Sequence, residues 1–314
     1  MLDPSHADAV ADRFGLGPAR RLLGPVALGR QGEIWRLDTD RGPFAVKQSQ
    51  VAPEPDEAEA DAVFQELVRA AGVPTPEVVR DVDGRVVSEV EGSPLRVYAW
   101  VDVEPEDRRL DPATVGRLLA AMHLVHVPAA GPVEGWYADP VGRAAWEGLV
   151  ERLATADCPF TGRLSALVPV LAEVETLLVP PTDGLQLCHR DVWADNLRAT
   201  PGGGLVIYDW ENAGPASPSQ ELGVAAYEYG CSDPARVRAL HAAYVDAGGP
   251  GRLREPADLT MLVAQLTHIL QIGCERWLAS TTDAVRTDHA GWVGEFLDDP
   301  VTVPVVEMLL DAAR

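Results

Sequence analysis

The sequence predicts an α+β fold of two lobes, an antiparallel sheet with a helix followed by a mainly helical lobe. Short apolar segments separated by glycine and proline turns dominate up to about residue 102, and longer periodic apolar stretches dominate after it. A glycine-rich turn at 201–204 then joins two short strands inside the helical part. We therefore divide the 314 residues into lobes 1–101 and 102–314.

The first lobe contains alternating apolar segments of strand length, broken by turns such as Asp81-Val-Asp-Gly84. In the third strand, alternation places Lys47 and Ala45 on one face, and Val46 and Phe44 on the other. The expected elements are a helix at 5–14, strands at 22–28, 34–37 and 44–47, a helix at 57–71, and strands at 77–80, 85–90 and 95–102.

Lys47 is the single lysine among 26 basic residues, and all the others are arginines. An ammonium group is a compact point charge, whereas guanidinium is a broad planar fork, so Lys47 is a candidate for a role that arginine does not fill. Chance retention is the alternative. In the helix that follows, Glu59, Val63 and Leu67 recur at i, i+4 and i+8, which predicts Glu59 on the inward face as the partner of Lys47. The alternative for Glu59 is a solvated acid.

The tight turn from Gly29 to Gly32 precedes the second strand. Such a turn can fold backbone N–H groups over phosphates while a strand lysine reaches them. Two glycines at this spacing are weak evidence, because most such turns only reverse the chain.

The second lobe contains apolar residues at helical spacing, and Asp111-Pro112 is a typical helix start. The long apolar segment at 256–280 is expected to lie in the core. The expected helices are at 111–125, 139–154, 160–178, 219–229, 233–246, 256–280 and 301–313, with a strand at 185–188.

The chemistry concentrates in residues 188–212. Asp191 and Asn196 lie five residues apart, a Pro-Gly-Gly-Gly turn follows, and a short apolar run ends in Asp209. A hairpin folds its flanks together, so the three side chains are expected to meet. Phosphoryl transfer needs a group that accepts the proton of the attacking hydroxyl, and oxygen ligands for Mg²⁺. Each residue alone could be a turn residue, but the joint pattern favours the chemical interpretation.

The net charge of −22 argues against a nucleic-acid partner, whose phosphates need a basic surface. It suits a cationic substrate, or serves solubility alone. The start of the chain does not resemble a signal peptide, and no apolar run has the length of a membrane span. The four cysteines are far apart and fit free thiols in a reducing cytoplasm.

Two segments carry a resemblance to a known family. His189-Arg190-Asp191 continuing to Asn196, and then Ile207-Tyr208-Asp209-Trp210-Glu211, resemble the signature of the aminoglycoside phosphotransferase and choline kinase family. The resemblance covers about residues 20–280 and implies a protein-kinase-like fold. It also implies ATP and Mg²⁺ as cofactors, a nucleotide-binding first lobe, and a catalytic and substrate-binding second lobe.

The resemblance implies a role for each matching residue. Asp191 resembles the catalytic base, His189 the structural histidine of the catalytic loop, and Asn196 and Asp209 the Mg²⁺ ligands. The residues implied to contact or support the nucleotide are Lys47 on the phosphates, its helix partner Glu59, the glycines Gly29 and Gly32, and the hinge residues Tyr98, Trp100 and Val101.

Three departures from the family pattern stand out. Asp195 occupies a position where the family has a small residue, and it either adds a carboxylate or caps the turn. Glu221 stands where the family has an aspartate that supports the catalytic loop. The glycine turn has only two glycines, so few N–H groups are expected to cover the phosphates.

The acceptor is a small molecule, expected to bind in the helical lobe. The acidic composition favours a cationic antibiotic such as an aminoglycoside. Alternative acceptors are an amino alcohol, a homoserine-like compound or a sugar amine. An alternative to an enzyme is a nucleotide-binding pseudokinase.

The chain after Asp209 argues against a protein kinase, because it enters a helix too soon for an activation segment. The choice between monomer and dimer, and between ATP and GTP, stays open. Candidate substrate residues are Trp193, Asp195, Glu211, Glu228 and Glu275.

Overall fold

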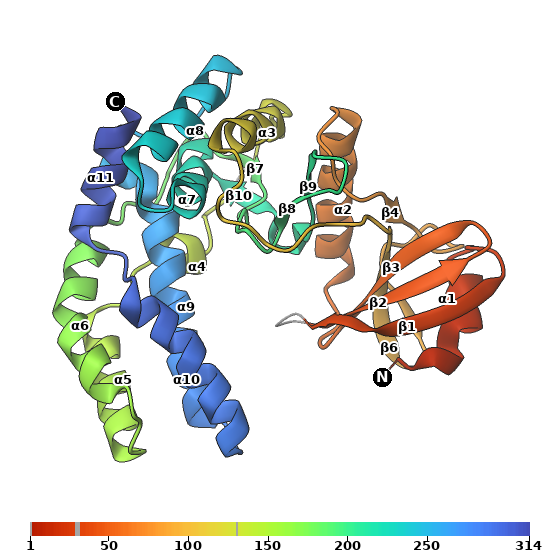
Figure 1. The fold of residues 1–314 in the computed structure, drawn as a ribbon, viewed down its shortest axis with the longest axis horizontal. Coiled ribbons are helices and arrows are strands. Elements are labelled where there is room, and N and C mark those ends of the chain that lie inside the picture. Colours follow the sequence, from red (N-terminus) through yellow and green to blue (C-terminus); the bar gives the residue numbers. More distant parts are fainter. Residues whose placement is uncertain (1, 29–31, 130) are drawn as a thin grey trace. The chain divides into compact units, whose positions relative to one another are not determined.

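A computed structural model of the chain describes residues 2–28, 32–129 and 131–314 (Figure 1). The chain forms two compact units. Unit 1 comprises residues 1–107 and 189–214, and unit 2 comprises residues 108–188 and 215–314. This packing differs from the division at 101/102 inferred from composition, because the segment 189–214 packs with residues that precede it by more than a hundred positions. The assignment of nucleotide binding and catalysis to separate lobes stays a prediction.

The centre of unit 1 is an antiparallel sheet of six strands (Figure 1). Its order is β1-β2-β3-β6-β4, and β5 pairs with β6. All the strands predicted from alternation are present, although several differ by a few residues at their ends. The bounds are β1 Ala19–Leu28, β2 Gly32–Thr39, β3 Gly42–Ser49, β4 Val78–Val79, β5 Ser88–Val90 and β6 Ser93–Ala99.

Helix α1 (Ala7–Arg13), preceded by the short 3₁₀ helix η1 (Pro4–His6), packs against one face of this sheet. Val10 of α1 is fully buried in one apolar cluster with Val46 and Val97. These two strand residues are the partners of a β3–β6 pair, so they point to the same face. The opposite face therefore carries the residues that alternate with them, among them Lys47.

Helix α2 (Pro55–Ala70) presents a different face inward from the one predicted. Val63 and Leu67 are 42% and 45% exposed, and the side chain of Glu59 is 46% exposed. The predicted inward stripe is therefore wrong. The inward face of the helix is instead formed by Ala58, Asp61, Ala62, Phe64, Gln65 and Val68, which are all buried.

The predicted hairpin at 201–204 is confirmed. Strands β8 (Leu197–Ala199) and β9 (Leu205–Ile207) pair antiparallel, with Leu197 opposite Ile207. The short 3₁₀ helix η3 (Trp210–Asn212) follows at once. Trp210 is 1% exposed, its ring meets that of Phe64 edge-on at 5.5 Å, and its Nε1 donates to Thr75 Oγ1 at 2.8 Å. These contacts attach the hairpin to α2 within unit 1.

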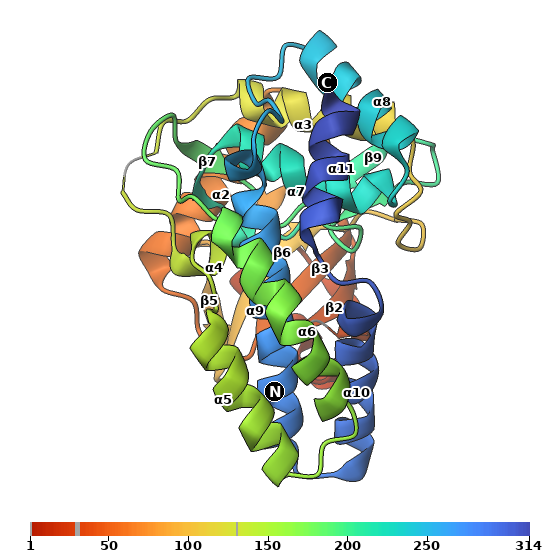
Figure 2. The same cartoon turned by 90° about the vertical axis from the view of Figure 1, so that its left-hand side faces the viewer.

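Unit 2 is mainly helical, as predicted (Figure 2). Strands β7 and β10 form a small pair where the chain leaves and re-enters it. The bounds are α3 Pro112–Leu124, α4 Gly135–Ala138, α5 Arg143–Thr155, α6 Thr161–Val174, η2 Glu175–Leu177, β7 Gln186–Cys188, β10 Gly214–Ala216, α7 Pro218–Gly230, α8 Pro234–Asp246, η4 Pro256–Leu259, α9 Thr260–Ala279, α10 Asp283–Asp298 and α11 Val303–Ala313.

Helices α5, α6, α9 and α10 run side by side and share one apolar core (Figure 2). Trp146, Leu164 and Cys274 are fully buried there. Helix α10 was not among the predicted helices, and its sequence contains two glycines, Gly291 and Gly294. It is held by tertiary packing, and its Val293 is fully buried in the same core.

Among the described residues, no helix combines the length and the apolar composition that crossing a bilayer would require. The four cysteines, all of which are described, form no disulfide. Cys158, Cys188 and Cys274 are buried and Cys231 is partly exposed.

Candidate active site

The β8–β9 hairpin brings Asn196 and Asp209 to the same end of one small sheet. Asn196 directly precedes β8, and Asp209 follows β9 by two residues. The backbone N–H of Tyr208 donates to the carbonyl oxygen of Asn196 at 3.1 Å, which extends the ladder by one more bond. Asp209 has a left-handed backbone (φ 63°), a conformation that turns the chain sharply out of the strand. The predicted meeting of these residues is therefore built by local pairing.

Asp191 is held by two amide groups. Its Oδ2 accepts from Asn196 Nδ2 at 2.8 Å and from Asn212 Nδ2 at 3.0 Å. Asn196 Nδ2 also donates to the backbone oxygen of Asp191 at 3.1 Å. Both side-chain bonds fall on the same carboxylate oxygen, so Oδ1 is the oxygen that an incoming hydroxyl would meet.

The environment of Asp191 favours the protonated carboxyl. Burial raises its pKa to about 7, the negative charges of Asp195 and Asp209 act in the same direction, and the bonds from Asn212 and Asn196 oppose it. A carboxyl group with a pKa near neutrality is suited to exchanging a proton at physiological pH.

His189 precedes Asp191 by two residues and is fully buried. Its Nε2 lies 3.1 Å from the carbonyl oxygen of Tyr208, and its Nδ1 accepts from the N–H of Asp191 at 3.2 Å. A carbonyl only accepts, so Nε2 carries the hydrogen. The ring also meets that of Trp210 edge-on at 4.7 Å. These contacts fit the structural role that the resemblance implies for His189.

Sequence reasoning missed two residues of this loop. Asn212 bonds Asp191 as described, and the Arg190 Nε donates to the carbonyl oxygen of Asn212 at 2.6 Å. Arg190 is buried with a left-handed backbone (φ 64°). Its guanidinium fills the space beside Gly214, where an added Cβ would lie 2.4 Å from the Arg190 Cζ. The available signal was the short distance in sequence between Asp209 and Asn212.

Lys47 reaches the hairpin from β3. Its Nζ lies 2.7 Å from Asp209 Oδ1 and 2.9 Å from Glu211 Oε1. Burial alone would lower the pKa of Lys47, but the charges of Asp209 and Glu211 outweigh it and raise that pKa. The lysine is therefore held as a cation next to the carboxylate that is predicted to bind metal.

The predicted pair between Lys47 and Glu59 is wrong. Glu59 Oε1 lies 2.8 Å from the Nη2 of Arg80, and Arg80 also contacts Glu66 at 3.1 Å. The side-chain hydrogen bond from Arg80 lowers the pKa of Glu59. Glu59 lies on an exposed face of α2, so the geometry gives no support to a nucleotide role for it.

Two of the remaining residues predicted to contact the nucleotide, Gly32 and Tyr98, lie on β2 and β6. Gly29 lies outside the described residues. Gly32 is buried in β2, and a Cβ there would lie 2.2 Å from the Gln48 carbonyl oxygen, so the close approach of β2 to β3 requires glycine. In β6, Tyr98 shares the face of Lys47, and burial raises its pKa to about 12.

Trp100 and Val101 follow β6 where a hinge was predicted. The backbone N–H of Trp100 already donates to the Pro43 carbonyl at 3.2 Å, and its ring lies under the Arg36 guanidinium at 4.9 Å. This N–H group therefore does not face a nucleotide. Val101, next in the chain, is partly exposed.

The candidate substrate residues have varied surroundings. Trp193 is partly exposed, and Asp195 is exposed, with its backbone oxygen accepting from the Tyr208 hydroxyl at 2.6 Å. Each of the three glutamates already has a cationic partner. Glu211 contacts Lys47, Glu228 lies 2.9 Å from Arg108 Nε, and Glu275 lies 2.7 Å from Arg152 Nη1.

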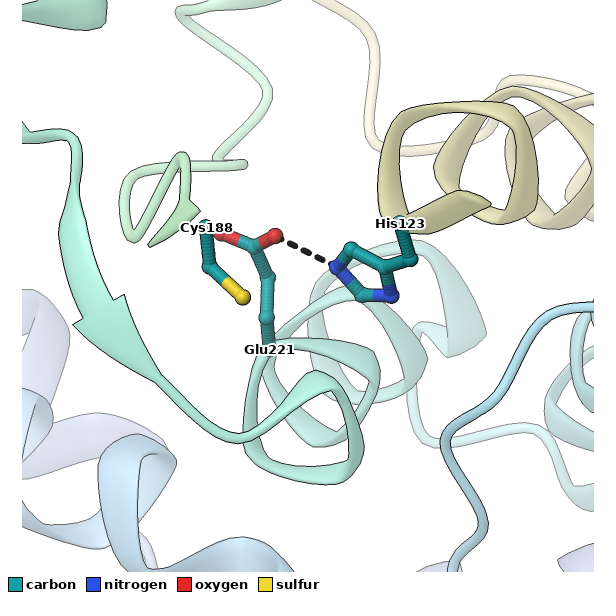
Figure 3. Close-up of side chains that lie close together, drawn as sticks. All are labelled: His123, Cys188 and Glu221. Atoms are coloured by element: carbon teal, nitrogen blue, oxygen red, sulfur yellow. Dashed lines mark hydrogen bonds and ion pairs between the residues drawn. The ribbon is translucent and has the colours of Figure 1, made fainter. Parts of the chain in front are cut away.

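Glu221 forms a buried cluster in unit 2 with His123 and Cys188 (Figure 3). The His123 Nε2 donates to Glu221 Oε2 at 2.7 Å, and His123 Nδ1 lies 2.7 Å from the Tyr244 hydroxyl. Although the three side chains are of metal-ligating types, hydrogen bonds occupy both nitrogens of His123, so we interpret the cluster as a brace. Cys188 ends β7, and its Sγ donates to the carbonyl oxygen of Ala216 at 3.7 Å.

The donor set at the hairpin fits Mg²⁺. Asn196 uses its Nδ2 for Asp191, which leaves the amide oxygen for a cation. Asp209 is 35% exposed and uses Oδ1 for Lys47, which leaves its second oxygen accessible to a hydrated ion. Mg²⁺ prefers one or two such oxygen ligands and keeps several waters.

Comparison with known proteins identifies a family and a shared fold. The model of a family described as "Phosphotransferase enzyme family" matches residues 23–256. No curated protein sequence matches. Among solved structures, spectinomycin phosphotransferase APH(9)-Ia in complex with ADP and spectinomycin has a TM-score of 0.70 at 13% identity, with 99% of this chain and 98% of that chain covered.

Two further solved structures share the fold. Amicoumacin kinase hAmiN has a TM-score of 0.60 at 12% identity, covering 93% of this chain and 92% of that one. Choline kinase LicA from Streptococcus pneumoniae has a TM-score of 0.55 at 14% identity, covering 93% and 96%. These likenesses confirm the predicted α+β, protein-kinase-like fold.

Proposed function

This chain belongs to the phosphotransferase enzyme family, and from that premise we propose that it moves the γ-phosphate of ATP to a hydroxyl group of a small molecule. The observation that carries the proposal is the convergence of Lys47, Asp191, Asn196 and Asp209 within unit 1. A cation for phosphates, a carboxyl for the hydroxyl proton and two oxygen donors for metal are the parts that this transfer needs.

In the proposed reaction, the hydroxyl oxygen of the acceptor attacks the γ-phosphorus of ATP, and Asp191 accepts the hydroxyl proton. The bond between the γ-phosphorus and the bridging oxygen breaks, and ADP leaves with that oxygen. The two amides on Oδ2 fix the carboxyl, so that Oδ1 faces the hydroxyl. Lys47 binds phosphate oxygens, and Asn196 and Asp209 would hold Mg²⁺, which supplies charge neutralisation on the phosphates. Positioning and electrostatics supply most of the rate.

We further propose a cationic alcohol as the acceptor, with amine-bearing antibiotics first. The net charge of −22 supports this class, because it attracts cations at long range. The proteins of similar fold include a spectinomycin phosphotransferase and an amicoumacin kinase. Choline kinase LicA, at comparable similarity, makes a metabolic amino alcohol the second candidate. The reaction belongs in the cytoplasm, where ATP is found and thiols stay reduced.

A turnover screen tests both levels of the proposal. ATP consumption with Mg²⁺ is measured over aminoglycosides, other amine antibiotics, choline, homoserine and glycated amines. One of these classes of compound is expected to be phosphorylated. The Asp191→Asn variant is expected to phosphorylate the same compounds about 10²–10⁴-fold more slowly. Turnover by Asp191→Asn at the wild-type rate would refute the assignment of the base. Mg-ATP binding without turnover on any acceptor would favour a pseudokinase.

A further inference from the structure

We infer that Glu211, held by Arg96, is the positioning residue that fixes Lys47 in the phosphate site. The inference rests on the proposed function, in which Lys47 binds the phosphates. It gives Glu211 a different role from the substrate contact predicted from sequence, and it replaces Glu59 as the acidic partner of the lysine.

The first step is the register of two neighbouring strands. Lys47 on β3 is the direct partner of Arg96 on β6, so the two side chains lie on the same face of the sheet. Arg96 is 3% exposed and Lys47 is 9% exposed. Two adjacent cations removed from water repel each other strongly and need a shared counter-charge.

Glu211 supplies that counter-charge. Its Oε1 lies 2.9 Å from Lys47 Nζ and 3.7 Å from Arg96 Nε, so one oxygen faces both cations. On the other side of Arg96, Asp61 Oδ2 lies 3.6 Å from the Arg96 Nη2. The Arg96 guanidinium thus lies between two acids, and its charge attracts the Glu211 carboxylate that contacts the lysine.

The backbone at Glu211 is also anchored. Glu211 follows Trp210, whose ring is buried against Phe64 and bonded to Thr75. The backbone that carries the Glu211 carboxylate is therefore fixed in the 3₁₀ helix η3.

The other partner of Lys47, Asp209, has a competing task. In the proposed function Asp209 is a metal ligand, so its negative charge is shared with Mg²⁺ when the nucleotide is bound. Glu211 has no such assignment, and it remains to hold Lys47. Glu59, by contrast, is paired with Arg80 on the exposed face of α2.

The test is the binding of AMP-PNP, a non-hydrolysable ATP analogue, with Mg²⁺ by isothermal titration calorimetry. Glu211→Gln is expected to raise Kd by about tenfold, because Lys47 loses one of the two carboxylates that contact it. The rival Glu59→Gln is expected to change Kd by less than about twofold, because exposed ion pairs contribute little. A Glu211→Gln protein that binds as tightly as wild type, or more tightly, overturns the inference.

A double-mutant cycle tests whether Glu211 acts through the lysine. In a Lys47→Met background, Glu211→Gln is expected to change Kd by less than about twofold, because the group it positions is gone. An equal loss in both backgrounds would mean a direct contact and would contradict the positioning role. Arg96→Lys is expected to keep part of the affinity that Arg96→Met loses.

Two outcomes separate the inference from the function beneath it. If Lys47→Met binds like wild type, the proposed phosphate role of Lys47 fails. If Lys47→Met weakens binding and Glu211→Gln does not, only the present inference fails. Thermal unfolding of each variant is measured first. Should Glu211→Gln not fold, Glu211→Asp, which keeps the charge on a shorter side chain, is expected to give an intermediate Kd, and a wild-type Kd would again overturn the inference.

Discussion

The Nδ2 of Asn212 lies 3.0 Å from Oδ2 of Asp191, although the two residues are 21 positions apart. This bond ties the proposed base to the chain that follows Asp209, the second proposed metal ligand. Arg190, next to Asp191, bonds the backbone oxygen of Asn212 in return. The two connections join the segment around Asp191 to the turn that contains Asn212, so Asn212 helps to orient the proposed base.

Replacing this amide should affect turnover more than nucleotide binding. Asn212→Ala removes one of two amides from Asp191 Oδ2, and we expect kcat to fall by about tenfold, since one charge-assisted bond orients the base. Steady-state kinetics with an acceptor from the screen measures this. The Kd of AMP-PNP with Mg²⁺ serves as the control and should stay within about twofold. An unchanged kcat would show that Asn196 alone orients Asp191.

The raised pKa of Asp191 predicts a pH profile. Only the ionised carboxylate accepts the proton, so kcat/KM, which reports the free enzyme, should fall about tenfold per pH unit below a pKa of about 7. A nearby metal ion favours the carboxylate, so the acidic limb of kcat should lie at lower pH than that of kcat/KM. A limb near pH 4 in both profiles would contradict the burial of this carboxyl.

The buried Trp210 should be coupled to Thr75 in stability. Trp210→Phe keeps an aromatic ring against Phe64 but removes the Nε1 donor, and we expect the free energy of unfolding to fall by about 1–2 kcal/mol. Urea unfolding of this variant, of Thr75→Val and of the double variant measures the coupling. The double variant should cost less than the sum of the two. Strict additivity would mean that the hydrogen bond contributes nothing.

Asp81 should stabilise unit 1 in a pH-dependent way. Burial alone would raise its pKa, but bonds from Ser88 and from the backbone N–H groups of Arg85 and Asp83, with the charge of Arg13, lower that pKa below the ordinary 3.8. Its stabilisation is therefore complete above about pH 4 and is lost as the pH falls through the lower, folded-state pKa.

The variant Asp81→Asn should lower the free energy of unfolding at pH 7 by about 1–3 kcal/mol, because buried donors lose a charged acceptor. The difference from wild type should shrink at pH 3. The matched control is Asp83→Asn, since Asp83 contacts the same arginine at 3.0 Å but is 52% exposed. It should cost less than about 1 kcal/mol. Equal effects of the two variants would contradict the importance of burial.

Local patterns were sufficient for the hairpin and for most strands and helices. The turn at 201–204 pairs β8 with β9, which places Asn196 and Asp209 at the same end of the hairpin. The buried face of α2 was not predictable from local patterns. Val63 and Leu67 recur at helical spacing but are exposed, and Asp61, an acid, is buried because Arg96 lies within 3.6 Å of it. Periodicity reports where apolar residues recur, and it does not reveal a cation on a distant strand.

The partners of Lys47 were missed for a related reason. Asp209 is 162 positions away, and the packing of Trp210 against α2 contributes to placing Glu211 beside the sheet. Glu59 was predicted as the partner of Lys47 because it is a nearby acid at a helical spacing from Val63 and Leu67. Asn212 and Arg190 were missed because their bonds join two turns, where spacing carries no periodic signal.

The single lysine also offers a specific proteolytic probe of the sheet in unit 1. A lysine-specific endoprotease has one bond to cut in the whole chain, the one between Lys47 and Gln48. That bond lies within β3, between β2 and β6, so it becomes accessible only when the sheet opens. The rate of this one cleavage thus reports the opening of unit 1 alone, and its suppression by a ligand gives a binding measurement that needs no label.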